Sequence, residues 1–231
     1  MIEISNDTES FDGLTYGVKE EYFYHPSEKI IGKRSNISAS GYAYPLKGDA
    51  EYRGWYRVSS GPDNGKRYWA PAWSKFNGAR PSGPHKGSDL FSYQRETLIA
   101  ISRGAMEFRS PKPNWGNHIY LYFKLNNVNH IAVYAHLDSS SAFSGVKQVG
   151  KGDEIGMAGC SGNAGDNGKC WRSNYCNGSL AIEDHLHLEL LRLNPDGSVD
   201  AKLDPVATFG WNVKYANDTS SGICKTKYQL A

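Results

Sequence analysis

The sequence lacks a long apolar run and an excess of charge of either sign. No stretch approaches the ~18 apolar residues that a membrane helix needs. Residues 1–13 contain no positive start followed by an apolar segment, so no classical export signal is visible. Lys and Arg number 26 against 24 Asp and Glu, which argues against nucleic acid as a partner. We therefore expect a soluble chain, and its charge balance does not indicate a particular class of binding partner.

Cysteine is scarce, and its spacing is not the CxxC pair of a zinc ribbon. An even number of cysteines in a Gly-rich chain favours two disulfides in an oxidising compartment, with Cys170 and Cys176 as the nearest local pair. Free buried thiols are the alternative, because the sequence does not choose among the three connectivities of Cys160, Cys170, Cys176 and Cys224.

Glycine, proline and aromatic residues are frequent instead, with 25 Gly, 10 Pro, 15 Tyr and 6 Trp. This composition favours short strands and turns over long helices, so the fold class is expected to be mostly β with few short helices. A chain of 231 residues is long enough for one sizeable core. We expect an N-terminal extension over 1–40, one domain of catalytic size over 41–212 and a C-terminal tail over 213–231.

Alternating apolar residues predict strands in the second half of the predicted domain. "HIYLYFK" and "HIAVYAHL" flank Asn126 and Asn127, which predicts a hairpin. In its second strand Val133 and Ala135 share one face, so His136 is expected to share the other face with Tyr134. "VGKGDEIGMAG" at 149–159 indicates a glycine turn into a further strand.

The segment "DHLHLEL" at 184–190 places leucines on one strand face and His185, His187 and Glu189 on the other. Two imidazoles aimed into one space form half of a metal site. For this motif alone, a half-buried strand that happens to carry histidine on its outer face is the better explanation, so the motif needs partners.

Two further segments supply candidate partners. In "PHKGSDL", three residues separate His85 from Asp89, and the surrounding Gly and Pro residues predict a loop that leads into a strand rather than a helix. A hydrogen-bonded turn is the simpler explanation of this pair alone. "VYAHL" adds His136. Together the segments provide three protein ligands and extra imidazoles to handle protons, as a hydrolytic zinc site requires.

In order, "HKGSD", "YAHL", "VGKGDEIG" and "HLHLE" resemble the motif set of the lysostaphin-like (LytM-type) zinc endopeptidases, which cut peptide bonds in peptidoglycan. The resemblance runs from about Tyr44 to Trp211. It implies an antiparallel β-sheet groove fold, the duplicated hybrid motif of these metallopeptidases, and one Zn²⁺ held by His85, Asp89 and His187.

The same resemblance makes His136 and His185 the catalytic histidines. HExxH is absent, so no glutamate base of that type is available, whereas a histidine near pKa ~6.5 can exchange protons near neutrality. Water activated by zinc would attack the peptide carbonyl. One histidine would take the proton, and the other would stabilise the oxyanion or protonate the leaving amine; the assignment stays open.

Other positions leave alternatives open. Glu189 either orients a ligand imidazole or forms a surface salt bridge, and Tyr134 either lines the groove or packs. His25, His118 and His130 match no motif and are interpreted as ordinary surface or strand histidines. The loop over 162–184 is longer than its family counterpart, and we expect it, pinned by Cys170 and Cys176, to form a groove wall.

The resemblance implies a monomeric peptidoglycan hydrolase, secreted or delivered to the periplasm or cell wall of a bacterium. An antibacterial toxin with an immunity protein as partner and a phage lysin both fit, and the cross-link is either a glycine bridge or D-Ala to meso-diaminopimelate. The alternative function is a catalytically silent module that binds peptidoglycan or activates a hydrolase. The filled ligand positions disfavour it.

Overall fold

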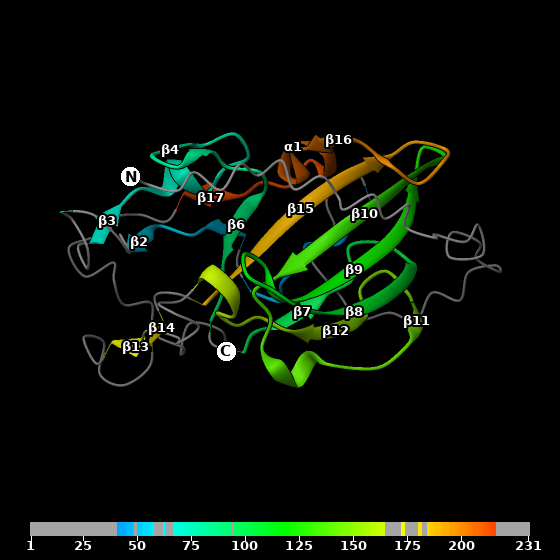
Figure 1. The fold of residues 1–231 in the computed structure, drawn as a ribbon, viewed down its shortest axis with the longest axis horizontal. Helices are drawn as coiled ribbons and strands as arrows, with labels where there is room; N and C mark the ends of the chain where they lie inside the picture. The colour runs from blue at the N-terminus through cyan, green and yellow to red at the C-terminus, as the bar shows by residue number, and fades with distance from the viewer. Residues whose placement is uncertain are drawn as a thin grey trace.

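The computed structural model describes residues 41–48, 50–57, 62, 67–93, 95–164, 172–173, 180–181 and 184–215. The fold is mostly β, as the composition predicts (Figure 1). In chain order the elements are β1 (Glu51–Tyr52), β2 (Trp55–Arg57), β3 (Arg67–Trp69), the 3-10 turn η2 (Pro71–Ser74), β4 (Ala79–Arg80), β5 (Gly83–Pro84), β6 (Ser88–Phe91), β7 (Thr97–Ile99), β8 (Gly104–Lys112), β9 (Gly116–Leu125), β10 (Val128–Ala135), η3 (Ser139–Ser141), β11 (Val146–Val149), β12 (Glu154–Met157), η4 (Gly162–Ala164), β13 (Arg172–Ser173), β14 (Leu180–Ala181), β15 (His185–Leu193), β16 (Val199–Leu203), α1 (Pro205–Phe209) and β17 (Lys214–Tyr215).

One large sheet dominates, with the strand order β11-β8-β9-β10-β15-β6-β1-β17 and with β16 on β15. Its pairs are antiparallel except β1 with β17. The long strands β8, β9, β10 and β15 form its middle (Figure 1). The predicted hairpin is confirmed: β9 and β10 join through Asn126 and Asn127, whose φ angles of 51° and 61° suit a type I′ turn.

The two faces of β15 differ in chemistry. Leu186, Leu188 and Leu190 are fully buried in the larger hydrophobic core. The helix α1 contributes Phe209 to this core, between an Asp204 N-cap and a left-handed Gly210. The opposite face of β15 carries the histidines, next to a second buried cluster from the same sheet. The leucines therefore anchor the strand and fix the direction of the imidazoles.

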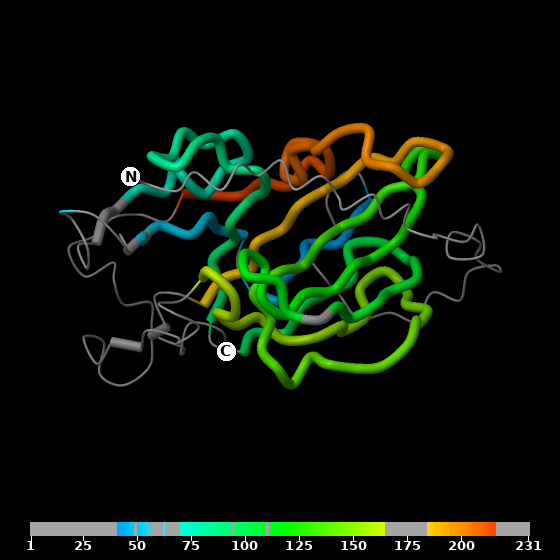
Figure 2. The backbone as a smooth tube through the Cα atoms, in the orientation of Figure 1, coloured from blue at the N-terminus to red at the C-terminus, as the bar shows by residue number. Residues whose placement is uncertain are grey.

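Segments far apart in sequence meet where β6 lies beside β15 (Figure 2). The register pairs Asp89 with His187 and Leu90 with Leu186. On the other side of β15, His187 pairs with Ala135 at the end of β10. The topology thus brings the three sequence segments that carry the candidate residues to one end of the sheet.

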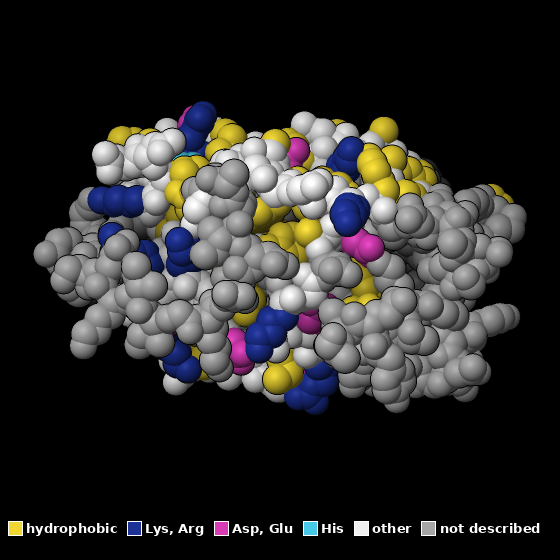
Figure 3. Space-filling view, turned by 180° about the vertical axis from the view of Figure 1, so that it is seen from behind, with side chains coloured by type: hydrophobic (Ala, Val, Ile, Leu, Met, Phe, Trp, Pro, Cys, Tyr) yellow, Lys and Arg dark blue, Asp and Glu magenta, His cyan; other side chains and the backbone are white. Residues whose placement is uncertain are grey.

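In the view from behind, Lys and Arg side chains are dispersed over the described part rather than gathered in one patch (Figure 3). Among the residues that can be described, no helix is both long and apolar enough for a membrane crossing.

Candidate metal centre

His85 lies in the loop between β5 and β6, and Asp89 lies in β6, so the loop leads into a strand as the sequence predicts. Gly87 allows this loop to approach β15. A Cβ atom at Gly87 would lie 2.8 Å from the ring Cε1 of His187 and 2.7 Å from the backbone oxygen of Leu188. Glycine is therefore required for the close approach.

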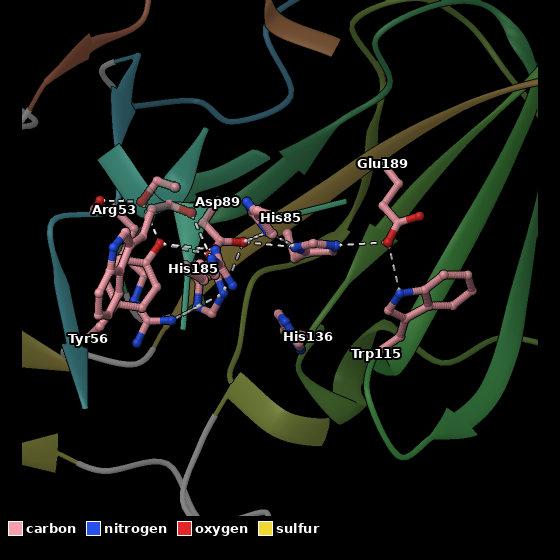
Figure 4. Close-up of polar contacts among 12 residues, drawn as sticks. Arg53, Tyr56, His85, Asp89, Trp115, His136, His185 and Glu189 are labelled. Carbon is pink, nitrogen blue, oxygen red and sulfur yellow. Dashed lines mark hydrogen bonds and ion pairs between the residues drawn. The ribbon is translucent and has the colours of Figure 1, made fainter. Parts of the chain in front are cut away.

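Three donor atoms converge between β6 and β15 (Figure 4). His85 Nε2 lies 3.1 Å from His187 Nδ1 and 3.3 Å from Asp89 Oδ1, and His187 Nδ1 lies 2.8 Å from Asp89 Oδ1. Donors about 2.0–2.2 Å from a tetrahedral zinc lie about 3.3–3.6 Å from one another. The observed separations come within about half an ångström of this spacing, so the group fits a metal ion.

The remaining ring nitrogens of both histidines face acceptors. His85 Nδ1 donates to the backbone oxygen of Lys75 at 3.1 Å, and His187 Nε2 lies 3.1 Å from Glu189 Oε1. This is the usual arrangement behind a metal-ligating imidazole, because it fixes the ring and leaves the other nitrogen free to bind. Trp115 Nε1 also donates to Glu189 Oε1 at 3.2 Å.

The buried charges favour cation binding. Although burial opposes it, the neighbouring His85 and Arg80 hold the pKa of Asp89 well below its usual range. Burial likewise opposes the shift at His187, but hydrogen bonds to Asp89 and Glu189 raise its pKa to about 9. The pKa of Glu189 falls to about 2 against burial, because it faces His187 and Lys202. The carboxylates of Asp89 and Glu189 thus both remain ionised beside the imidazole of His187.

His136 flanks the donor group from the end of β10. Its ring centroid lies 4.7 Å from that of His185 and 5.6 Å from that of His187. His136 has a φ of 65°, a left-handed conformation that is rare for a residue with a side chain. Its Nδ1 donates to the backbone oxygen of Ser161 at 2.8 Å, so the ring is held from outside its own strand.

The left-handed backbone corrects one prediction from the sequence. Continued alternation would place His136 on the face of Tyr134, but Tyr134 lies in the larger core and His136 turns toward His185 and His187. The Tyr134 hydroxyl donates to the backbone oxygen of Ile99 and accepts from the backbone N–H of Ile101, each at 3.0 Å. Tyr134 therefore packs and does not line the candidate site.

The sequence profile of "Peptidase family M23" matches residues 83–201. The chain belongs to peptidase family M23. No curated protein matches it significantly.

Several solved structures are similar to this M23 chain. The catalytic domain of lysostaphin from Staphylococcus simulans shares 23% identity, with 60% of this chain and 89% of that chain covered and a TM-score of 0.41. A catalytic domain of a prophage-encoded M23 protein from Enterococcus faecalis shares 20% identity, with 52% of this chain and 79% of that chain covered and a TM-score of 0.37. A zinc containing peptidase from Vibrio cholerae shares 19% identity, with 73% of this chain and 44% of that chain covered and a TM-score of 0.38. This chain therefore spans less than half of that protein.

The M23 site also contains residues that the sequence analysis missed. Arg53 Nη1 lies 3.2 Å and 3.4 Å from the two ring nitrogens of His185. Tyr56 and Arg80 contact the second oxygen of Asp89. None of the three lies in a motif with metal-ligand spacing, so only the folded chain brings them to the site.

The other histidines and cysteines are placed as follows. His118 and His130 lie buried in β9 and β10, consistent with ordinary strand histidines, whereas His25 lies outside the described residues. Cys160 is buried and disulfide-bonded. The expected Cys170–Cys176 pair, Cys224 and most of the loop over 162–184 lie outside the described residues, so that pairing and the groove wall stay predictions.

Proposed function

We propose that this M23 peptidase is a zinc-dependent endopeptidase that hydrolyses peptide cross-links in bacterial peptidoglycan. The observation that carries the proposal is the convergence of His85 Nε2, Asp89 Oδ1 and His187 Nδ1 within 3.3 Å of one another. Family membership supports the peptidase activity, and the order of the four sequence motifs supports peptidoglycan as the substrate.

His85, Asp89 and His187 would hold the zinc ion. Two imidazole nitrogens and one carboxylate oxygen are a donor set that suits zinc and leaves a position for water or substrate. When bound, zinc supplies a Lewis acid that polarises the scissile carbonyl and lowers the pKa of water to about 7. Glu189 orients His187 from behind, and its second carboxylate oxygen forms a 2.9 Å ion pair with Lys202.

His136 and His185 would handle the protons. Burial lowers the pKa of His136 to about 3, so its imidazole is neutral near pH 7. Because Nδ1 donates to the Ser161 carbonyl, Nε2 carries the lone pair. One of the two histidines accepts the proton of the attacking water, and the other donates to the oxyanion or to the leaving amine.

We place the protein in the cell wall or periplasm of a bacterium, as a secreted antibacterial effector or lysin. A toxin would require an immunity protein. The cross-link is either a glycine bridge or D-Ala to meso-diaminopimelate.

The test is digestion of purified glycine-bridged and diaminopimelate-type sacculi, with the released muropeptides identified by mass spectrometry. We expect the wild type to release peptides cut at one type of cross-link and His187→Ala to release none. His130→Ala is the matched control, because His130 is also a buried strand histidine but lies outside the donor group. If the wild type holds zinc and cuts neither sacculus, the proposal is wrong.

A further inference from the structure

The second oxygen of Asp89 faces two donors on the side away from the histidines. Tyr56 donates its hydroxyl to Asp89 Oδ2 at 2.9 Å, and Arg80 Nη2 lies 2.5 Å from the same atom. Oδ1, by contrast, faces His85 and His187. The carboxylate is thus divided: one oxygen faces the candidate metal position and the other is held by protein donors (Figure 4).

The two donors are themselves held by a buried network. The Tyr56 hydroxyl, which donates to Asp89, accepts from Arg80 Nη2 at 3.3 Å. It also packs against Ser74 Oγ, which donates to the backbone oxygen of Arg53. Arg80 donates from Nε to the backbone oxygen of Trp73 at 2.8 Å, and its guanidinium carbon lies 5.1 Å from the Tyr56 ring centroid. Tyr56 and Arg80 therefore each have a second anchor, which fixes their donors before any metal binds.

This network comes from a part of the chain that precedes the family match. Its side chains lie in β2, η2 and β4, all before residue 83, where the family profile begins to match. The same segment supports the other ligand, because the backbone oxygen of Lys75, directly after η2, accepts from His85 Nδ1. Arg53 adds a backbone N–H bond to the backbone oxygen of Asp89 at 2.9 Å.

We propose that Tyr56 and Arg80 are positioning residues that keep Asp89 a one-oxygen metal ligand, and that the metal-binding unit therefore begins near Arg53 rather than at the family match. The inference rests on the proposed function. A carboxylate can bind a metal through one oxygen or through both. Two donors on Oδ2 fix the rotation of the carboxylate and occupy its second oxygen, so the free protein already presents Oδ1 to the ion.

The experiment measures Co²⁺ and Zn²⁺ affinity by competition with a chelator, together with the visible absorption spectrum of the Co²⁺ protein. The variants are Arg80→Gln, Arg80→Lys and Tyr56→Phe in the full chain. Arg192→Gln is the matched control, because Arg192 forms an ion pair with Asp200 at the same 2.5 Å separation, in an exposed position. Thermal unfolding of each variant identifies any that fail to fold.

We expect Arg80→Gln and Tyr56→Phe each to weaken metal binding about 10- to 100-fold, the usual effect of removing an outer-shell partner. Both should alter the Co²⁺ spectrum because Asp89 is freed to change its binding mode. Arg80→Lys should restore part of the affinity, and Arg192→Gln should change neither quantity. If Arg80→Gln does not fold, Tyr56→Phe alone decides.

Wild-type affinity and an unaltered Co²⁺ spectrum in the folded variants would overturn the positioning role. That result would leave the proposed function intact, because the wild type would still bind the metal. Failure of the wild type itself to bind Co²⁺ or Zn²⁺ would instead remove the proposed function and the positioning role together.

Discussion

The described part of the chain contains two kinds of buried histidine. His118 and His130 lie in β9 and β10, and each donates from Nδ1 to the carbonyl two residues earlier, at 2.9 Å. His85 and His187 are buried to a similar degree, but their partners lie 10 and 98 positions away, at Lys75 and Asp89. Burial is shared by both kinds, whereas long-range polar partners distinguish the histidines of the candidate site.

The electrostatic consequence sets His187 apart, because burial lowers the pKa of His85 as well, despite the neighbouring Asp89. Burial lowers the pKa of His118 to about 4 and also lowers the pKa of His130. At His187 the hydrogen bonds to Asp89 and Glu189 overcome burial and raise the pKa to about 9. A buried histidine therefore marks a metal site only where carboxylates converge on it.

The largest expected effect separates the two groups directly. His187→Ala removes one of three protein ligands and should cost about 3 kcal/mol of the roughly 10–16 kcal/mol that zinc sites supply. Hydrolysis should fall to background, because the two remaining ligands no longer fix the ion beside His136 and His185. His130→Ala should keep both metal and activity. Zinc analysis and chelator competition provide the measurement, and equal affinities of the two variants would contradict the distinction.

A second effect separates metal binding from proton transfer. His136→Ala should bind zinc like the wild type but lose about 10²- to 10⁴-fold in kcat, the usual contribution of a general acid or base. Metal content and kcat, measured on the same sample, check this expectation. Loss of the metal together with activity would make His136 a ligand rather than a proton carrier.

The loop that holds His136 gives a smaller effect through backbone packing. A Cβ at Gly116 would lie 2.3 Å from Ser161 Oγ and 2.4 Å from the backbone nitrogen of Gly162. Gly116→Ala should therefore displace Ser161 and misplace His136, with a loss of up to about 100-fold in kcat.

Gly145→Ala is the matched control for this variant. Gly145 also has a positive φ, 72° against 60° at Gly116, but a Cβ added to Gly145 would meet nothing within 4 Å beyond its chain neighbours. Both alanines carry the left-handed strain of about 1–2 kcal/mol, so thermal unfolding should respond to both. Only Gly116→Ala should reduce kcat, and equal kcat values would show that the Ser161 contact does not position His136.

The smallest expected effect is the change in apparent zinc affinity with each unit of pH. A metal must displace the proton of His187, whose pKa of about 9 lies above neutrality. Apparent zinc affinity should therefore rise about tenfold per pH unit between pH 6 and 8 and level off near pH 9. His118 is already neutral in this window, because its pKa is about 4. His118→Gln should keep the slope, and a flat profile in the wild type would contradict the account.

Much of the fold and of the donor group could be predicted from the sequence. Alternation predicts the β9–β10 hairpin and the split faces of β15, because both depend on local period and turn chemistry. The Gly- and Pro-rich context of His85 correctly predicts a loop before the strand of Asp89. The three candidate ligands, His85, Asp89 and His187, meet as a group that can hold a metal.

The remaining features depend on three-dimensional contacts that no local pattern encodes. The left-handed turn at His136 breaks the alternation that the sequence predicts, and it is supported by Ser161, 25 positions away. Tyr56 and Arg80 reach Asp89 across separations of 33 and 9 positions without metal-ligand spacing. The catalytic roles of His136 and His185 and the domain boundaries stay predictions. The large sheet extends to Tyr215, beyond residue 212, where the predicted domain ends.

The most direct test of the central claim is a crystal structure of the zinc-loaded protein, with anomalous diffraction measured at the zinc edge. The account predicts one strong peak about 2.0–2.2 Å from His85 Nε2, Asp89 Oδ1 and His187 Nδ1. A peak held by other side chains, or none at this position in a protein that hydrolyses peptidoglycan, would contradict it.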